Sequence, residues 1–340
     1  MQTSWVKYLS AAALAIGLMG AAQTATVAGF DDGLAAKYYE TFKGKKVAFV
    51  PISMGFDLTQ GWMAAVQRDA DRLGYQLIIR DPNWSVDAGA QALEQLIIEK
   101  PDIIIFHNND MQAYAKLVQR AMAAGINVIQ VNLKTPVNGD FFVGADLYEQ
   151  GRRELEETAK LCGADSSGKI ALIQGPVTSP PSQIGLAGIM DALPKHPNLT
   201  VVSTQAADWD ASKAHSIAST VLKQHPDLCA IIGFWDNQDI GAAAAIREAG
   251  LTGKVQLITA GGGNLESACK NIANGAYSAY IKSDTRSQAY QLASAIQILL
   301  QTKPEPGSKP VGLYTEVNVI TKDNMEPSSC WTVDQIKAGN

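Results

Sequence analysis

Two tryptophans, each followed by an aspartate, are the residues of this sequence best suited to holding a small molecule. Trp209 precedes Asp210, and Trp235 precedes Asp236 just after a short apolar run. An indole offers a flat apolar face and one N–H donor, while aspartate oxygens accept hydrogen bonds from hydroxyl groups. A sugar ring, with C–H groups on its face and hydroxyls around its edge, matches this combination. The alternative is that each tryptophan is an ordinary core residue.

Other polar residues and glycines also follow apolar runs directly. His107 and Asn132 each come after such a run, and Ser283 follows another within the sequence KSDT. The sequence AGGGN at 260–264 either lets a ligand approach the backbone or forms a tight turn. These residues add hydrogen-bonding groups and backbone access to the two tryptophans.

The sequence lacks the arrangements that catalysis or metal binding requires. It contains no GxSxG motif and no HExxH pair. The stretch GADSSGKI at 163–170 resembles a phosphate-binding loop, but Ile170 stands where Ser or Thr is required, and the stretch runs from a helix into a strand. A net charge of −5 argues against a nucleic-acid surface. We therefore expect no catalytic residue, no metal, no cofactor and no nucleic-acid partner.

The elements that must position these residues alternate regularly between strand and helix. The apolar runs predict strands at 46–52, 75–79, 102–106, 126–131, 169–174, 200–204, 230–234 and 255–260. Helical periodicity predicts helices at 60–73, 87–99, 111–124, 180–193, 211–224 and 237–249. Continuously apolar strands are typical of parallel sheets covered on both faces, so the pattern predicts a doubly wound α/β fold.

The α/β pattern occurs twice. The segment PDIIIFHNND at 101–110 is echoed by PDLCAIIGFWDN at 226–237, and each leads into an alanine-rich helix. A repeat this long predicts two lobes of similar topology. Because ligands bind beyond the carboxyl ends of strands in open α/β sheets, the polar residues named above would meet in a cleft between the lobes.

The N-terminus has the pattern of a secretory signal peptide. Lys7 precedes an apolar stretch from Leu9 to Ala22, which is too short to span a bilayer. Small residues allow cleavage after residue 22, 25 or 28, so we assign residues 1–28 to the signal peptide. The alternatives are a buried N-terminal helix or a membrane anchor.

Export permits disulfides, and two pairings fit the predicted sheet. Cys162 precedes the predicted strand at 169–174, and Cys229 precedes the one at 230–234. Because these two strands of the second lobe should be neighbours, we expect a Cys162–Cys229 disulfide. We also expect Cys269–Cys330, which would pin the tail to the second lobe. The alternative is four free thiols.

The chain resembles the type I periplasmic binding proteins, in the ribose-binding-like branch that serves sugar ABC importers. The best matching stretches are ADRLGYQL (70–77), PDIII (101–105), AGINVI (124–129) and ADWD (207–210). The resemblance implies two doubly wound parallel-sheet lobes joined by a three-segment hinge, with crossings near Ala145, Ser283 and Tyr314. Lobe one would comprise 44–145 plus 284–314, lobe two 146–283 plus 315–328, and the tail 329–340.

The resemblance also implies ligand-contacting positions in both lobes. These positions are Phe56, Leu58, Thr59, His107, Asn132, Gln183, Trp209, Trp235, Asp236, Gly261 and Ser283. Several depart from the family pattern, because Asn132 stands where Asp is usual, Leu133 and Gln183 where Arg is usual, and Gly261 where Asp is usual. Losing these charge-assisted hydrogen bonds predicts a more aromatic and less charged pocket, which favours a sugar alcohol, a modified sugar or a flat ligand.

The function implied by the resemblance is solute binding in the periplasm. A monomeric protein would close its hinge around a sugar or polyol and dock on an inner-membrane ABC permease. Two alternatives keep the fold, namely a non-sugar ligand such as an aromatic or furanosyl signal, and a chemoreceptor-coupled sensor. An enzyme is disfavoured because no nucleophile and base are paired.

Overall fold

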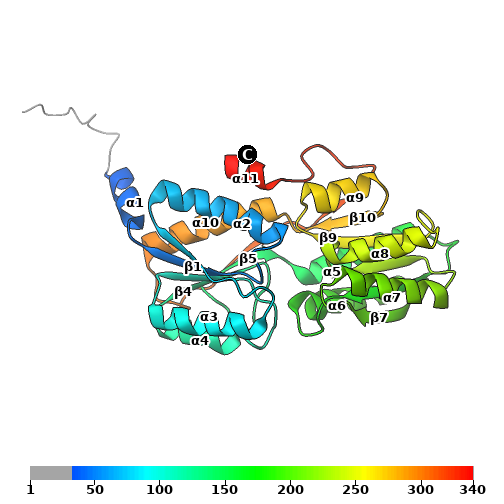
Figure 1. Cartoon of the computed structure of the whole chain (residues 1–340), viewed down its shortest axis with the longest axis horizontal. Helices are drawn as coiled ribbons and strands as arrows, with labels where there is room; N and C mark the ends of the chain where they lie inside the picture. Colours follow the sequence, from blue (N-terminus) through cyan, green and yellow to red (C-terminus); the bar gives the residue numbers. More distant parts are fainter. Residues whose placement is uncertain (1–32, 340) are drawn as a thin grey trace, which may run out of the picture.

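Two six-stranded sheets form the centres of two lobes that lie side by side (Figure 1). The structure, a computed structural model, describes residues 33–339, so the predicted signal peptide at 1–28 lies outside the described residues. Within residues 33–339, no helix is long and apolar enough to cross a membrane.

The first lobe has the strand order β11-β5-β4-β3-β1-β2. Its strands are β1 (Lys46–Val50), β2 (Gln76–Ile79), β3 (Ile103–Phe106), β4 (Asn127–Val131), β5 (Phe141–Ala145) and β11 (Val311–Thr315). Its helices are α1 (Leu34–Phe42), α2 (Asp57–Leu73), α3 (Val86–Glu99), α4 (Ala115–Ala123) and α10 (Thr285–Thr302).

The second lobe has the strand order β12-β10-β9-β8-β6-β7. Its strands are β6 (Lys169–Gln174), β7 (Thr200–Ala206), β8 (Ala230–Gly233), β9 (Gln256–Gly261), β10 (Ala279–Lys282) and β12 (Asn318–Ile320). Its helices are α5 (Leu147–Cys162), α6 (Leu186–Ala192), α7 (Ala211–Gln224), α8 (Asp236–Glu248) and α9 (Lys270–Ala273), with single turns at Pro181–Gly185, Leu193–Lys195 and Leu265–Cys269.

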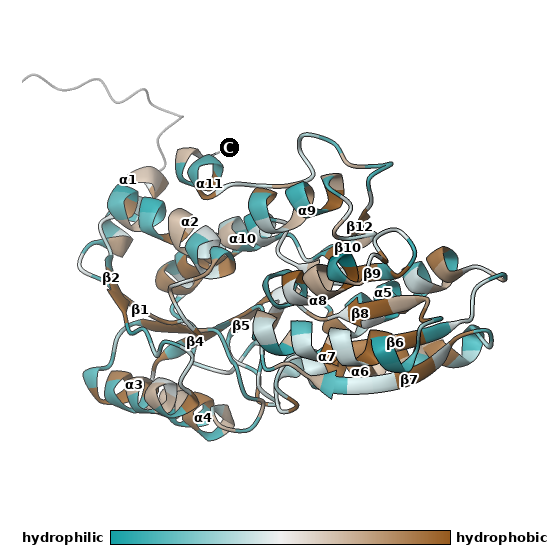
Figure 2. Cartoon of the chain, turned by 45° about the vertical axis from the view of Figure 1, so that its right-hand side comes forward, coloured by the Kyte–Doolittle hydropathy of each residue, from teal (hydrophilic) through white to brown (hydrophobic). Residues whose placement is uncertain are grey.

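Helices cover both faces of each sheet, which explains why the strands are apolar throughout. In β1, Val47 and Phe49 pack with α2 and α10, whereas Ala48 and Val50 pack with α3 and α4 on the other face. Hydrophobic strands therefore lie between helices whose outer residues are hydrophilic (Figure 2). Burial of both faces favours the parallel arrangement.

The two sheets share one topology, and this confirms the predicted doubly wound α/β class. β3 and β8, the strands of the repeated segment, occupy the same place in the two orders. Among residues 33–339, the strand pairs are parallel except for β10 and β12, which are antiparallel. The carboxyl ends of the central strands face the space between the lobes.

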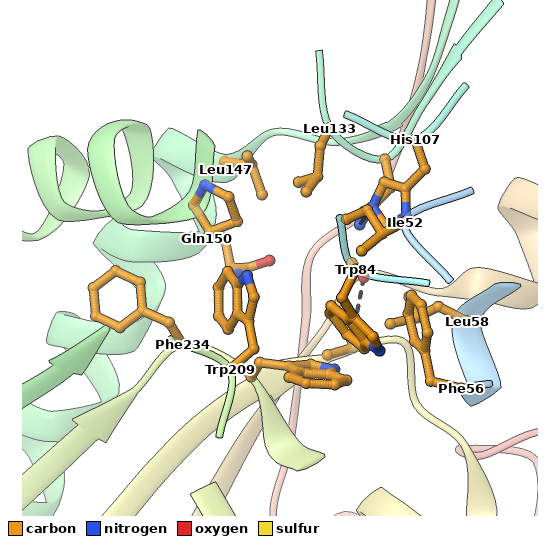
Figure 3. A pocket seen from close by; sticks show the side chains of 15 residues that line it. Ile52, Phe56, Leu58, Trp84, His107, Leu133, Leu147, Gln150, Trp209 and Phe234 are labelled. Carbon is orange, nitrogen blue, oxygen red and sulfur yellow. Dashed lines mark hydrogen bonds between the residues drawn. The ribbon is translucent and has the colours of Figure 1, made fainter. Parts of the chain in front are cut away.

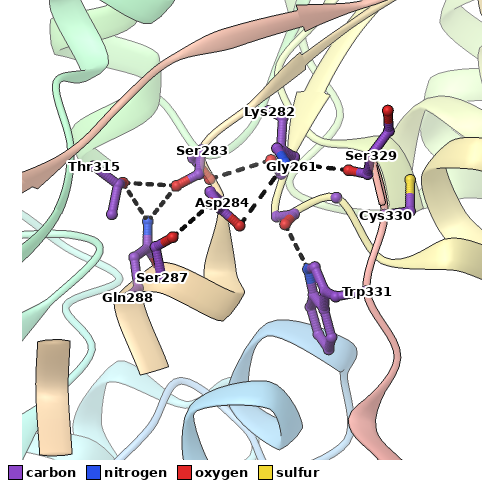
Figure 4. A network of polar contacts seen from close by, with 12 residues as sticks. Gly261, Lys282, Ser283, Asp284, Ser287, Gln288, Thr315, Ser329, Cys330 and Trp331 are labelled. Carbon is purple, nitrogen blue, oxygen red and sulfur yellow. Dashed lines mark hydrogen bonds and ion pairs between the residues drawn. The ribbon is translucent and has the colours of Figure 1, made fainter. Parts of the chain in front are cut away.

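Before the tail at 329–339, the chain passes between the lobes at three short junctions, from β5 to α5, from β10 to α10 and from β11 to β12. Side chains tie two of these junctions together (Figure 4). Thr315 Oγ1 donates to the carbonyl of Ser283 at 2.7 Å, and Gln288 Nε2 donates to the same carbonyl at 2.8 Å. The adjacent segments are therefore coupled rather than independent linkers.

The structure joins Cys162 to Cys229 and Cys269 to Cys330, the pairing expected from the sequence. The first disulfide links the end of α5 to the residue before β8, with the Cα atoms 5.8 Å apart. β8 lies beside β6, as the pairing argument required.

The tail differs from expectation because it does not stay on lobe two. After Cys330 the chain forms α11 (Val333–Ala338), which packs on α2 of lobe one. Trp331 and Ile336 are buried in the core that α2 shares with the first sheet. Their apolar side chains explain the return to lobe one, which the disulfide argument alone could not foresee.

Other elements differ at their ends. α2 begins at Asp57 rather than residue 60, and β5 was not predicted as a strand. α4 begins at Ala115 rather than residue 111, because the Asp110 carboxylate accepts the backbone N–H groups of Gln112 and Ala113 and holds a turn there.

Candidate ligand-binding site

A cavity between the lobes collects residues from the carboxyl ends of both sheets (Figure 3). The space that the centre of a water molecule can reach measures about 70 Å³. The cavity is lined by Ile52, Phe56, Leu58, Trp84, His107, Asn132, Leu133, Leu147, Gln150, Pro181, Trp209, Phe234, Trp235, Gly261 and Ser283. Apolar surface dominates this wall, and within residues 33–339 no charged side chain contributes to it.

Trp235 stands at the centre of an aromatic cluster that joins the lobes. Its ring centroid lies 5.7 Å from Phe56 and 5.9 Å from Trp84, both of lobe one. Trp209 of lobe two lies 5.8 Å away, with its ring nearly perpendicular. Such edge-to-face pairs are favourable beyond the area they bury. The cluster supplies flat faces from both lobes to one cavity.

Helix starts and constrained loops place these rings. Phe56 and Trp235 are the residues just before α2 and α8, in extended conformation. Trp84 and Trp209 have left-handed backbones, with φ of 72° and 63°. Bulky residues rarely adopt this conformation, and where they do the strain is often found at functional sites. Here it turns two indoles towards the cleft.

His107 contributes a neutral imidazole. Burial lowers the pKa of His107 to about 3, so the ring is uncharged at physiological pH. The side-chain amide nitrogen of Asn132 lies 3.3 Å from His107 Nε2. Because an amide N–H only donates, Nε2 accepts and the ring proton resides on Nδ1.

Gln150 is held by a buried acid. Its Nε2 donates to Glu154 Oε1 at 3.2 Å, and burial raises the pKa of Glu154 to about 8. One N–H of Gln150 is therefore used within the protein, and its other N–H and side-chain oxygen remain for a ligand.

Most of the residues named from the sequence meet at this cavity. Those that line it are Phe56, Leu58, His107, Asn132, Trp209, Trp235, Gly261 and Ser283. Thr59 is fully buried within the first turn of α2. Gln183 is exposed and donates to the carbonyl of Val177 at 3.3 Å. Asp236 is buried beside a separate hollow.

Part of the cavity wall was not predicted from the sequence. The residues not proposed as contacts are Ile52, Trp84, Leu133, Leu147, Gln150, Pro181 and Phe234. Trp84 lies in the loop after β2, but Ser85 rather than an aspartate follows it, so the pattern that identified Trp209 and Trp235 does not mark it. Leu147 and Gln150 start α5 just after a crossing, and nothing in their local sequence marks them.

The second hollow brings two carboxyl groups of opposite lobes together. Ser267 Oγ lies 3.0 Å from Asp57 Oδ2 and 2.8 Å from Asp236 Oδ2. Burial raises the pKa of Asp57, and burial together with the nearby Asp57 raises the pKa of Asp236 to about 8. Tyr280 donates to Asp236 at 2.7 Å. The lobes are thus in direct polar contact, as in a closed cleft.

These features define a two-lobed α/β binding protein with its cavity enclosed between the lobes. Residues 47–304 match the family described as Periplasmic binding protein domain, and the chain belongs to this family. The family resemblance seen in the sequence is therefore confirmed, and the chain belongs to a class of binding proteins rather than enzymes.

Relatives with assigned roles align over much of the chain. It is 28% identical to the D-ribose/D-allose-binding protein of Pseudomonas aeruginosa over 302 residues, which cover 85% of this chain and 92% of that protein. It is 26% identical to the ribose import binding protein RbsB of Salmonella typhimurium over 186 residues, or 54% of this chain and 62% of that protein.

Solved structures show the same fold. An ABC transporter solute-binding protein from Burkholderia graminis, in complex with D-arabinose, superposes with a TM-score of 0.76 at 24% identity and covers 85% of this chain and 99% of that chain. A periplasmic solute-binding protein from Actinobacillus succinogenes with bound D-allose has a TM-score of 0.70 at 22% identity, covering 82% and 98%.

Proposed function

We propose that this protein binds a small neutral sugar or sugar alcohol between its lobes and delivers it to an inner-membrane ABC permease. The single observation that carries the proposal is the aromatic cluster around Trp235, which spans the two lobes. Stacking faces beside the polar groups of His107, Asn132 and Gln150 match a ring with an apolar face and a polar edge. The sugar-binding roles of the relatives point to the same ligand class.

Export and the monomeric state belong to the same proposal. Residues 1–28 act as a cleaved signal peptide that sends the chain to the periplasm, where its two disulfides are stable. The chain works as a monomer, because one chain supplies both halves of the cavity.

The lobes move as units in this proposal. Lobe one is 44–145 plus 284–314, and lobe two is 146–283 plus 315–328. Ligand bridging Phe56 and Trp235 favours the closed form by its extra affinity for that form. The permease then recognises the closed surface.

Calorimetric titration with D-ribose, D-allose, D-arabinose and ribitol tests the proposal. At least one should bind saturably at one site. Trp235→Ala should weaken that binding by about 2–4 kcal/mol, because a buried aromatic anchor is lost. Tyr39→Ala, at an aromatic residue of α1 that is 50% exposed and lies outside the cavity, serves as the control. Absence of binding by the whole set, or equal affinities in the two variants, would contradict the proposal.

A further inference from the structure

The cavity offers a ligand fewer hydrogen-bond donors than its polar side chains contain, because the protein uses several itself. Ser283 Oγ donates to the carbonyl of Gly261 at 3.1 Å. Gln150 Nε2 donates to Glu154 at 3.2 Å, and the amide of Asn132 donates to the histidine described above at 3.3 Å. What remains of each amide is its acceptor oxygen and one N–H.

Two buried N–H donors of the cavity wall have no partner. His107 Nδ1 and Trp235 Nε1 make no hydrogen bond with any residue that the structure describes. An unpaired buried donor costs free energy, so each is a place where a ligand oxygen would be held. A ligand that fits this wall would therefore accept one hydrogen bond from each of these two N–H groups.

Few groups of the cavity wall can accept hydrogen bonds from the hydroxyl groups of a ligand. The carboxylates nearest the cavity are engaged elsewhere, since Asp239 accepts from Thr259 and from the Trp235 backbone, and Asp236 accepts from Tyr280. A fully hydroxylated pyranose would have to place part of its hydroxyl-bearing edge against apolar side chains of the wall, where those hydroxyls find no partner. Each unpaired hydroxyl would weaken binding.

We propose that the ligand is a deoxy sugar, in which at least one hydroxyl of the parent sugar is replaced by hydrogen. Its deoxygenated edge lies against the apolar wall formed by residues such as Leu133 and Leu147. Its remaining oxygens accept from His107 Nδ1–H and Trp235 Nε1–H. This inference rests on the proposed sugar-binding function and narrows it.

Matched sugar pairs test the inference by titration calorimetry. The pairs are D-galactose with 6-deoxy-D-galactose, L-mannose with 6-deoxy-L-mannose, and D-allose with 6-deoxy-D-allose. In the pair that binds best, the deoxy member should bind about tenfold tighter or more, as expected when one hydroxyl no longer goes unpaired. A parent sugar that binds equally or tighter overturns the inference and leaves the sugar-binding proposal standing. Absence of binding in every pair overturns the deoxy-sugar class, and if the parent sugars of the first titration also fail, the proposed function falls with it.

A conservative variant isolates the N–H donor. Trp235→Phe keeps a ring but loses Nε1–H, so affinity for the best deoxy sugar should fall about tenfold or more. Tyr39→Phe is the control, because it also removes one polar group from an aromatic side chain, and Tyr39 is 50% exposed on α1, outside the cavity. Equal losses in the two variants would contradict the role of Trp235 Nε1.

A second and independent observation concerns the tail. Its backbone is attached to lobe two, since Trp331 N–H donates to the carbonyl of Gly263 at 3.0 Å and Leu265 N–H donates to the Trp331 carbonyl at 2.8 Å. The Cys269–Cys330 disulfide fixes the same point covalently.

The side chains of the tail are buried in lobe one instead. Trp331 packs so closely on Gly61 of α2 that a Cβ there would lie 2.7 Å from the indole. Ile336 is fully buried, and Arg68 of α2 donates to its carbonyl at 2.8 Å. Trp331 Nε1 also donates to the Gly262 carbonyl at 2.6 Å, next to the crossing into α10 (Figure 4).

We infer that the tail is a strap that limits how far the lobes open without ligand. Separating the lobes at this edge would pull Trp331 from the core of lobe one, because the disulfide holds its neighbour on lobe two.

Small-angle scattering of ligand-free variants tests the strap. Cys269→Ser with Cys330→Ser should increase the radius of gyration relative to the natural chain. Cys162→Ser with Cys229→Ser, which removes the disulfide within lobe two, should leave it unchanged. Circular dichroism first sets a temperature at which both variants are folded. Trp331→Ala, with both disulfides intact, should reproduce the increase. Unchanged radii for both strap variants would overturn the inference.

Discussion

Trp209 depends on a glycine beneath it as well as on its own strained backbone. Gly175, at the end of β6, lies so close to the Trp209 ring that a Cβ there would overlap the ring. The Trp209 N–H donates to Gln238 Oε1 at 2.9 Å, which fixes the loop from the other side. The indole is therefore placed by residues that never touch the cavity, and its orientation is preorganised.

Gly175→Ala should weaken ligand binding by displacing Trp209. We expect a loss of about tenfold or more, since an anchor moved from its best geometry loses much of its stacking. Gly55→Ala is the control, because a Cβ at Gly55 meets only Ser53 at an ordinary 3.4 Å. Titration calorimetry compares them, and unchanged affinity in Gly175→Ala would show that Trp209 does not contact the ligand.

At the scale of the elements, the N-termini of α2 and α8 face each other across the cleft. They bring Asp57 and Asp236 onto one Ser267 hydroxyl, which has a single hydrogen for two carboxylates. A proton on one carboxyl group supplies the missing hydrogen bond. Burial is the main cause of both raised pKa values, and opening would remove the Asp57 charge from Asp236, so the part of the shift that comes from this pairing belongs to the closed form.

Closure should therefore take up a proton, and ligand affinity should depend on pH. A carboxyl group whose pKa is higher in the closed form stabilises that form at low pH, and the effect is lost as pH rises through about 8 for Asp236. Affinity should fall between about pH 5 and 8, by up to about tenfold per pH unit for one proton. Calorimetry across this range checks it.

Asp57→Asn should flatten the pH dependence, since the amide supplies hydrogens without titrating. Glu154 and Asp239 also have raised pKa values, but both lie within lobe two and do not depend on closure in this way. If the variant keeps the full pH slope, another group is responsible.

The elements that could be predicted from the sequence are those whose signal is local. The apolar runs at β1, β3, β6 and β8 predict strands because both faces of each are buried. The docking of α11 on α2 depends on contacts across more than 250 residues of chain, such as Arg68 to Ile336, which no local pattern encodes. Leu147 reaches the cavity for the same kind of reason, because only the crossing at β5 puts it there.

The Cys162–Cys229 disulfide within lobe two should stabilise the fold by lowering the conformational entropy of the unfolded chain. Cys162 and Cys229 are 67 residues apart, for which loop-closure entropy gives about 4 kcal/mol. The Cys162→Ser, Cys229→Ser double variant should lose roughly this amount in urea denaturation. A loss near zero would mean that the folded state or residual unfolded structure offsets the entropic gain.

At the scale of the whole molecule, two lobes of one topology face each other with their strand ends inward. The lobes contact each other through the aromatic cluster, through Ser267 on Asp57, and through Met111 N–H, which donates to the Thr178 carbonyl at 3.1 Å. Separating the lobes would break these contacts and open the cavity to ligand. The fold thus supports a hinge motion in which ligand stabilises the closed form.

Small-angle scattering with and without the sugar that binds in calorimetry tests this central claim most directly. The ligand-free protein should populate open forms, so saturation with the sugar should decrease the radius of gyration while circular dichroism stays constant. Trp235→Ala at the same sugar concentration should show little decrease. An unchanged radius at confirmed saturation of the natural chain would contradict closure around the ligand.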